Sequence, residues 1–248
     1  MLNYDNATTV ANEEQILKDF QKRSQQCYQN YPCIQGISYA QAPRTCLDLF
    51  PVQAAKKTVV FIHGGYWQWC DKSDFAFITP YVIEQQMQCV LLEYDLAPTV
   101  SLTDIVKQVK QAIDFITQQP WMTEELILVG HSAGAHLAAV MLDHPRVNRA
   151  VLLSGIYDLQ PIQQTPLNQA LQLNEWEIQH LSPYLHSDKV NKPYEIYCGD
   201  DELTALRWQS QQYFKKRHAL DGDQVQFAFI PDTNHYTILD QYFQHYLH

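Results

Sequence analysis

The chain has 248 residues, of which 46% are hydrophobic and 18% charged, and its formal net charge is -10. This length suits one α/β domain or two small ones, and it can bury a large core without crosslinks. The negative charge argues against nucleic acids and anionic membranes as partners. The N-terminal residues are polar and no stretch is long and apolar enough to span a bilayer, so we expect a cytoplasmic protein.

Strand-like and helix-like segments alternate along most of the sequence. The first predicted elements are a helix over residues 11–28 and a strand over 46–50. Further strands are predicted at 58–62, 89–94, 126–129, 150–154, 194–198 and 224–230. Helical stretches separate them at about 74–86, 102–118, 133–144 and 204–218, and a final helix is expected from about 236. This alternation predicts an α/β fold, with a mostly parallel sheet covered by helices on both faces.

Residues 156–193 interrupt this rhythm. They contain no strand-like run and carry prolines at positions 161, 166, 183 and 193. Because the segment is short and strands of the same predicted sheet flank it, we interpret it as a helical excursion that caps the site. The prediction is a single domain over residues 1–248, with 156–193 as the cap.

A Gly-x-Ser-x-Gly motif at residues 130–134 is the most informative feature of the sequence. It follows the apolar run 126–129 and precedes a run rich in helix formers. A strand, this motif and a helix in succession are typical of a nucleophile elbow, whose tight turn holds a serine oxygen at the top of a sheet. The context predicts that Ser132 is a nucleophile and that the N–H group of Ala133 stabilises an oxyanion.

A glycine-rich loop, His-Gly-Gly-Tyr-Trp at residues 63–67, directly follows another predicted strand. Loops of this kind offer backbone N–H groups to a developing negative charge. We therefore expect Gly64, Gly65 and Tyr66 to supply further donors of the oxyanion hole. His63 is expected to support this loop by hydrogen bonding.

An activated serine needs a base within hydrogen-bond reach and a carboxylate that orients the base. In hydrolases with such an elbow, the acid and then the histidine follow the serine along the chain. His235 lies in the loop after the last predicted strand, just before the final helix, which is where the base is expected. His131 and His136, close to Ser132 in the sequence, are expected to be packing or solvated residues instead.

The acid has several candidates. Asp200, Asp201 and Glu202 crowd the turn after strand 194–198. A carboxylate a few residues beyond the strand end can reach back toward the histidine loop, which favours Glu202 over Asp201 and Asp200. Asp158, which follows the strand before the cap segment, is a further alternative.

The loop at residues 63–67, the elbow at 130–134 and Asn-His-Tyr at 234–236 together resemble the kynurenine formamidases (arylformamidases). These are α/β hydrolases close to the hormone-sensitive-lipase-like esterases. Family members look like Gly-x-x-acid followed by Gln-Ser, a spacing that places the acid at Glu202. The resemblance implies an α/β-hydrolase fold and hydrolysis of N-formyl-kynurenine, a small-molecule substrate of tryptophan catabolism, to kynurenine and formate. It implies no metal and no organic cofactor.

The aryl side of such a substrate favours a flat apolar wall. The aromatic residues expected to supply it are Tyr66, Trp67, Trp69 and Tyr157. Two other functions stay open for this sequence: a carboxylesterase that acts on small acyl esters with the same three residues, and a catalytically silent fold that only binds ligands. No histidine pair or acidic cluster has the spacing of a metal site.

Overall fold

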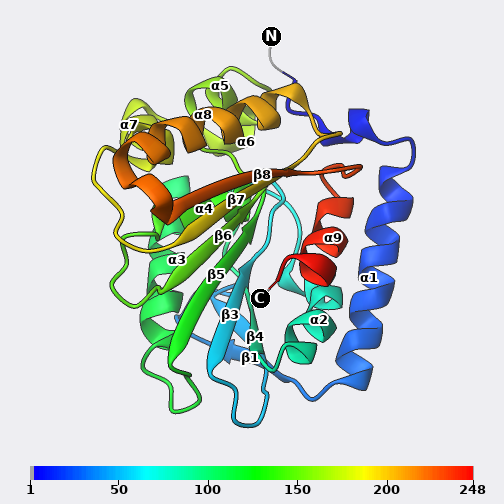
Figure 1. Cartoon of the computed structure of the whole chain (residues 1–248). Helices are drawn as coiled ribbons and strands as arrows, with labels where there is room; N and C mark the ends of the chain where they lie inside the picture. Colours follow the sequence, from blue (N-terminus) through cyan, green and yellow to red (C-terminus); the bar gives the residue numbers. More distant parts are fainter. Residues whose placement is uncertain (1–2, 248) are drawn as a thin grey trace.

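The computed structural model describes residues 3–247, and in this range eight strands form one sheet in the order β1-β2-β4-β3-β5-β6-β7-β8 (Figure 1). β1 (Ile34–Ser38) pairs antiparallel with β2 (Cys46–Phe50), and β2 pairs antiparallel with β4. The other neighbouring strands are parallel: β3 (Lys57–Ile62), β4 (Gln88–Leu92), β5 (Glu125–His131), β6 (Arg149–Leu153), β7 (Tyr194–Gly199) and β8 (Val225–Ile230). The predicted mostly parallel sheet is confirmed.

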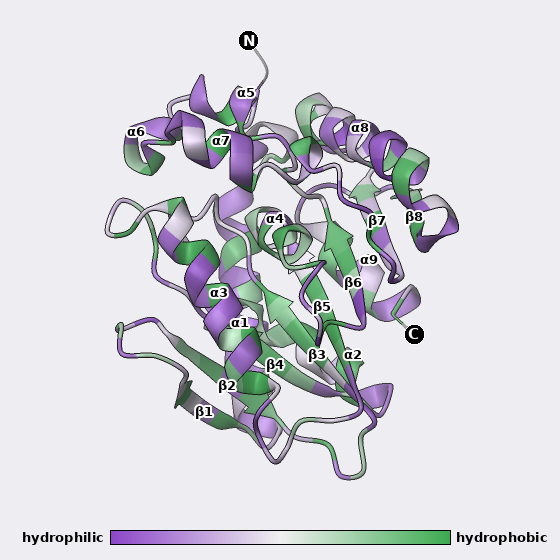
Figure 2. Cartoon of the chain, turned by 90° about the vertical axis from the view of Figure 1, so that its left-hand side faces the viewer, coloured by the Kyte–Doolittle hydropathy of each residue, from purple (hydrophilic) through white to green (hydrophobic). Residues whose placement is uncertain are grey.

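The central strands are apolar along their whole length because both of their faces are buried. In β3, Val60 and Ile62 belong to the core on one side of the sheet, whereas Val59 and Phe61 belong to the core on the other. Figure 2 shows the hydrophobic colour concentrated in the central strands and much hydrophilic colour on the surrounding helices. The sheet is thus the rigid frame on which the loops at its carboxyl edge are held.

Two groups of helices cover the two faces of the sheet (Figure 1). One group packs on the first face: α1 (Glu13–Asn30), α2 (Thr79–Glu84) and α9 (Thr237–His245). The other group packs on the opposite face: α3 (Leu102–Ile116), α4 (Ala133–Val140) and α8 (Thr204–Asp221). This confirms the predicted cover on both faces. The single helix expected at 74–86 is instead a 3-10 stretch, η2 (Lys72–Ile78), followed by α2.

Helix α3 shows why these segments are helical. Apolar residues recur along it at three- and four-residue spacing and form its buried stripe: Leu102, Ile105, Val109, Ala112, Ile113 and Ile116. Ser101 precedes the helix, and its side chain accepts a hydrogen bond from the Asp104 N–H group. Such an N-cap satisfies a backbone donor that the first turn leaves unpaired. The stripe and the cap together fix where α3 starts and which face meets the sheet.

The segment at 156–193 forms short helical pieces: α5 (Gln160–Gln163), α6 (Asn168–Leu171), α7 (Glu175–Leu181) and η3 (Pro183–Leu185). In Figure 1, α5, α6 and α7 lie along the upper edge of the molecule beside α8. α7 begins with a capping box formed by Asn174 and Glu177. That this segment caps the site stays a prediction. None of the described helices has both the length and the apolar character needed to cross a membrane.

Candidate functional site

Ser132 lies in a sharp turn between β5 and α4. Its backbone angles are φ 57° and ψ -119°, a combination that residues with a side chain seldom adopt. Two hydrogen bonds hold the turn: Ser132 N donates to the Leu153 carbonyl oxygen at 2.8 Å, and Ala135 N donates to the Ser132 carbonyl oxygen at 3.0 Å. Strained backbone of this kind persists only where the surroundings enforce it. Ser132 is thereby held at the wall of a cavity.

Two glycines allow this turn. A Cβ atom on Gly134 would lie 1.9 Å from the Ile62 carbonyl oxygen, and one on Gly130 would lie 2.2 Å from the Gly134 carbonyl oxygen. Both distances are far below van der Waals contact. Glycine at these positions lets the first turn of α4 pack directly against the backbone of the neighbouring strands.

Replacing Gly134 with alanine should lower the free energy of unfolding by about 3 kcal/mol, because the added methyl group would overlap backbone atoms, which cannot move away as a flexible side chain can. Urea titration measures this quantity. Gly36→Ala is the matched control, since a Cβ there meets no atom within 4 Å and only the positive φ of 68° is penalised. That penalty is about 1 kcal/mol. Equal losses in the two variants would contradict the prediction.

His235 and Glu202 meet at the same cavity. The Nδ1 atom of His235 lies 2.9 Å from Glu202 Oε2, so this nitrogen donates to the carboxylate. Among the described residues, none forms a hydrogen bond with the Nε2 atom of His235. The other carboxylate oxygen, Glu202 Oε1, accepts from Gly199 N at 3.0 Å and from the hydroxyl of Ser154.

The structure places Glu202, and not the three alternative acids, beside His235. Asp201 is exposed, and Asp158 accepts a hydrogen bond from Gln160 N at 3.0 Å. Asp200 has a buried oxygen that no described residue contacts by hydrogen bonding. Sequence reasoning missed Ser154, which directly follows β6 and holds the carboxylate of Glu202. Its signal in the sequence was only its position at the carboxyl end of a buried strand.

The glycine-rich loop approaches the serine closely. A Cβ atom on Gly64 would lie 2.9 Å from the Cβ of Ser132. Gly64, Gly65 and Tyr66 line the cavity together with Ser132, and Ala133 is the first residue of α4. Within residues 3–247 no acceptor is recorded for the N–H groups of Gly65, Tyr66 and Ala133. Free amides at a helix N-terminus are suited to bind an anionic oxygen.

His131 connects the serine turn to the histidine loop. Its Nε2 atom donates to the His235 carbonyl oxygen at 2.9 Å, and the two ring centroids are 4.6 Å apart. Burial holds the pKa of His131 well below its usual range, so the ring is neutral. Burial also lowers the pKa of His136, to about 4, and its Nε2 atom donates to the Leu181 carbonyl oxygen at 2.7 Å. His136 is packed inside the protein, whereas the buried His131 also lines the cavity.

The cavity has a volume of about 1030 Å³. Segments that are far apart in the sequence form its walls: the glycine-rich loop, the residues 165–167 and 169–170 of the cap segment, and the N-terminal residues 3–6. Tyr66 links two of these walls, because its hydroxyl donates to the Tyr4 carbonyl oxygen at 2.6 Å. Trp69 also lines the cavity and is 52% exposed, so its ring is accessible to a ligand.

Trp67 and Tyr157 do not line the cavity, which corrects their expected place in the aromatic wall. Trp67 is fully buried, and its indole meets the ring of His136 edge to face at 5.0 Å. Tyr157 is fully buried and stacks on Tyr213 at 4.2 Å. Both side chains turn into the hydrophobic core beneath the loops that carry them. Of the four aromatic residues expected at the site, Tyr66 and Trp69 line the cavity.

Cys70 also lines the cavity, so its thiol is an alternative nucleophile to the hydroxyl of Ser132. Burial raises the pKa of Cys70 to about 12, so the thiol stays protonated and is a poor nucleophile. Across residues 3–247, no group of three or more His, Cys, Asp and Glu side chains is arranged to hold a metal ion. The chemistry that the described side chains offer is therefore that of a hydroxyl, an imidazole and a carboxylate.

Comparison with known proteins identifies similar sequences. Two family profiles match, one described as BD-FAE over residues 47–146 and one described as serine aminopeptidase, S33, over residues 97–219. The kynurenine formamidase of Salmo salar is 32% identical over 197 residues, which cover 74% of this chain and 67% of that protein. The kynurenine formamidase of Danio rerio is 30% identical over 224 residues, which cover 84% of this chain and 76% of that protein.

A solved structure shares the fold. The crystal structure of a candidate thioesterase from Silicibacter sp. tm1040 superposes with a TM-score of 0.89 over 98% of this chain and 94% of that one. The two sequences are 22% identical, so the likeness shows the fold alone. This fold is the α/β-hydrolase fold that the sequence motifs implied.

Proposed function

Because this chain belongs to the kynurenine formamidase family, we propose that it cleaves an aryl formamide, N-formyl-kynurenine, to kynurenine and formate. The chain is a hydrolase with the α/β-hydrolase fold. In the proposed mechanism, Ser132 is the nucleophile. The proposed setting is tryptophan catabolism in the cytoplasm.

In the first half of the proposed reaction, the Oγ atom of Ser132 attacks the formyl carbon. The Nε2 atom of His235 takes the hydroxyl proton, and Glu202 stabilises the imidazolium through its bond to Nδ1. The formyl oxygen becomes an oxyanion that faces the N–H groups of Gly65 and Ala133, with Gly64 and Tyr66 beside them. Each such donor contributes a factor on the order of 10²–10³ to the rate.

In the second half, His235 returns its proton to the aryl nitrogen, and the C–N bond breaks. Kynurenine leaves, and a formyl ester remains on Ser132. A water molecule then attacks the ester carbon while His235 takes one of its protons. The ester bond breaks, the proton passes to Ser132 Oγ, and formate is released. The formyl group is small, so most of the cavity is available to the aryl side of the substrate.

The observation that best supports this function is that the strained Ser132 and His235, which is bonded to Glu202, line the same cavity. A fluorophosphonate probe should label Ser132 in the intact protein, and peptide mapping would locate the label. An unlabelled serine would reject the serine mechanism and favour a fold that only binds ligands.

Carboxylesterase activity on small acyl esters is the alternative, because the same three residues can cleave an ester. A panel of aryl formamides and short nitrophenyl esters separates the two functions through the ratio of their kcat/KM values. Turnover of acetate esters without turnover of N-formyl-kynurenine would replace the proposed substrate class with esters.

Trp69→Ala should lower kcat/KM for N-formyl-kynurenine about tenfold and change that for a small acetate ester about twofold at most. Trp69 lines the cavity, and its ring lies edge to face with that of Tyr66 at 6.4 Å. A contact between the Trp69 ring and the aryl ring of the substrate would contribute about 1.5 kcal/mol to binding. Trp208→Ala is the control, since Trp208 is exposed on α8 and does not line the cavity. Similar losses on both substrates would argue against an aromatic wall at Trp69.

A further inference from the structure

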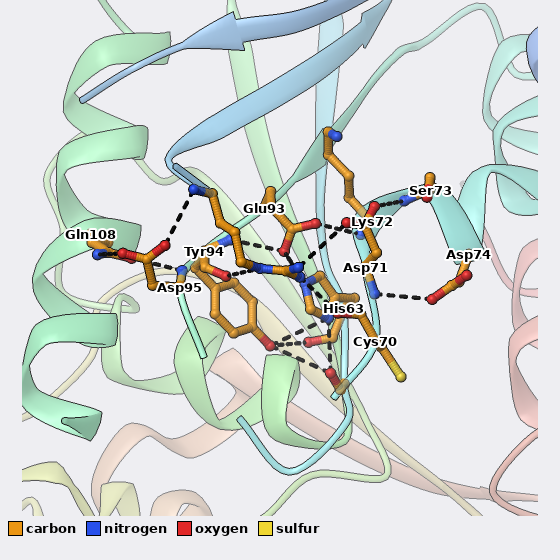
Figure 3. Close-up of polar contacts among 12 residues, drawn as sticks. His63, Cys70, Asp71, Lys72, Ser73, Asp74, Glu93, Tyr94, Asp95 and Gln108 are labelled. Carbon is orange, nitrogen blue, oxygen red and sulfur yellow. Dashed lines mark hydrogen bonds and ion pairs between the residues drawn. The ribbon is translucent and has the colours of Figure 1, made fainter. Parts of the chain in front are cut away.

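A cluster of charged and polar side chains surrounds the root of the glycine-rich loop (Figure 3). At its centre is His63, which is fully buried and whose ring stacks on that of Tyr94 at 4.4 Å with an interplanar angle of 8°. The hydroxyl of Tyr94 donates to the His63 carbonyl oxygen at 2.8 Å. The side chains of His63 and Tyr94 do not line the cavity, whereas Gly64 and Gly65, which follow His63 in the chain, do.

Both ring nitrogens of His63 face oxygen acceptors. The Nδ1 atom lies 2.8 Å from the Gly64 carbonyl oxygen, and the Nε2 atom lies 2.9 Å from Glu93 Oε1. A carbonyl oxygen can only accept, so Nδ1 carries a hydrogen and donates it to Gly64. The contact with Glu93 at the opposite side of the ring fixes the direction in which Nδ1 points.

Glu93 is itself held from several sides. It is 1% exposed, and its carboxylate accepts from the guanidinium of Arg44 at 2.6 Å and from the N–H groups of Lys72 at 2.9 Å and Tyr94 at 3.1 Å. Arg44 also donates to the carbonyl oxygen of Cys70 at 2.7 Å. Glu93 thus connects the ring of His63 to the end of β4, and Arg44 extends this connection to Cys70.

The bond from His63 to Gly64 has a consequence on the cavity side. In a trans peptide the carbonyl oxygen and the following N–H group point in opposite directions. His63 binds the Gly64 carbonyl oxygen, so the Gly65 N–H group points away from the His63 ring. Gly65 lines the cavity, and no acceptor for its N–H group is recorded in the described part of the chain.

We infer that His63, oriented by Glu93, is a positioning residue that turns the Gly64–Gly65 peptide so that the Gly65 N–H group meets the oxyanion. This inference rests on the proposed serine mechanism. His63 touches neither the substrate nor Ser132 in this role. It acts through the peptide, and its effect falls on the transition state because only there does the carbonyl oxygen carry full negative charge.

The test compares His63→Leu with His63→Asn. Leucine removes the donor, whereas the side-chain amide of asparagine places an N–H group near the position of Nδ1. His63→Leu should lower kcat about 10²-fold with KM changed about threefold at most, the loss expected when one oxyanion donor is removed. It should weaken binding of a trifluoromethyl ketone, which forms an oxyanion on Ser132, by a similar factor. His63→Asn should recover kcat to within about tenfold of the wild type.

Gln108→Leu is the matched control, because the side chain of Gln108 forms its hydrogen bonds with Asp95 in the same polar region and not with His63 or Glu93 (Figure 3). It should keep kcat within about twofold. Equal kcat values in His63→Leu and wild type, or equal losses in His63→Leu and His63→Asn, would overturn the inference. If His63→Leu does not fold, the test uses His63→Asn and Glu93→Gln. A Glu93→Gln variant that binds the trifluoromethyl ketone with wild-type affinity would overturn the inference. If the fluorophosphonate probe labels wild-type Ser132, these outcomes bear on His63 alone; if it does not, the proposed mechanism and this inference fall together.

Discussion

Replacing Ser132 with alanine should lower kcat/KM for the preferred substrate by roughly 10⁴–10⁶-fold, the loss expected when the nucleophile of a serine hydrolase is removed. The remaining turnover would come from the oxyanion donors and from substrate binding. Alanine carries a Cβ atom at the same place as serine, so the turn at φ 57° meets no new strain. The free energy of unfolding should therefore change by about 0.5 kcal/mol at most. Steady-state kinetics and urea titration measure the two effects.

Ser24→Ala is the control for Ser132→Ala. The hydroxyl of Ser24 donates to the Asp74 carbonyl oxygen at 2.8 Å and accepts from Phe77 N at 3.1 Å, on the packing surface between α1 and η2. Its loss should cost about 1 kcal/mol of stability and leave kcat/KM unchanged. Activity of Ser132→Ala within tenfold of the wild type would show that another group performs the attack.

The strands could be predicted from sequence where the sheet buries them on both faces. The apolar runs that became β3, β5 and β6 have flanking turns and no competing pattern, and their predicted positions agree with the structure. β1 was missed because it is an edge strand. Its residues are mostly exposed, Gly36 has a φ of 68°, and the pairing register shifts between Ile34 and Ile37. Nothing in its pattern distinguishes such a strand from a loop.

The order of the motifs along the chain located the serine, the histidine and the acidic turn, because chain order and sheet position are linked in parallel sheets. The direction of individual side chains in loops could not be obtained in this way. Tyr66, Trp67 and Cys70 all have positive φ values, which no sequence rule anticipates for such residues. In this loop Trp69 borders the cavity, whereas Trp67 is fully buried.

The N-terminal wall of the cavity was also invisible to sequence reasoning. Tyr4 is buried, and its hydroxyl accepts from Gln209 Nε2 at 2.7 Å, a contact across 205 positions of the chain. Burial raises the pKa of Tyr66 above its ordinary value, so its hydroxyl remains a donor to Tyr4. Such long-range contacts leave no local pattern in the sequence.

Glu202→Gln should lower kcat roughly 10⁴-fold, whereas Asp201→Asn and Asp158→Asn should change it about threefold at most. The carboxylate of Glu202 accepts the Nδ1 hydrogen of His235 at 2.9 Å and keeps Nε2 free to take the serine proton. An amide in its place can present an N–H group to Nδ1, which selects the wrong tautomer and removes the charge that stabilises the imidazolium.

The structure also explains why the amide cannot turn over to restore this bond. The second oxygen of Glu202 accepts from Gly199 N at 3.0 Å and from Ser154 Oγ, and an amide nitrogen there would face the N–H group of Gly199. Each orientation of the amide thus breaks one set of contacts. The loss of kcat should therefore occur in a folded Glu202→Gln variant, and circular dichroism would verify that it is folded. Because Asp201 is exposed at the same turn, its substitution removes a similar charge without touching His235. A large loss in Asp201→Asn with a small one in Glu202→Gln would reassign the acid, and kcat for the three variants on one aryl formamide decides between them.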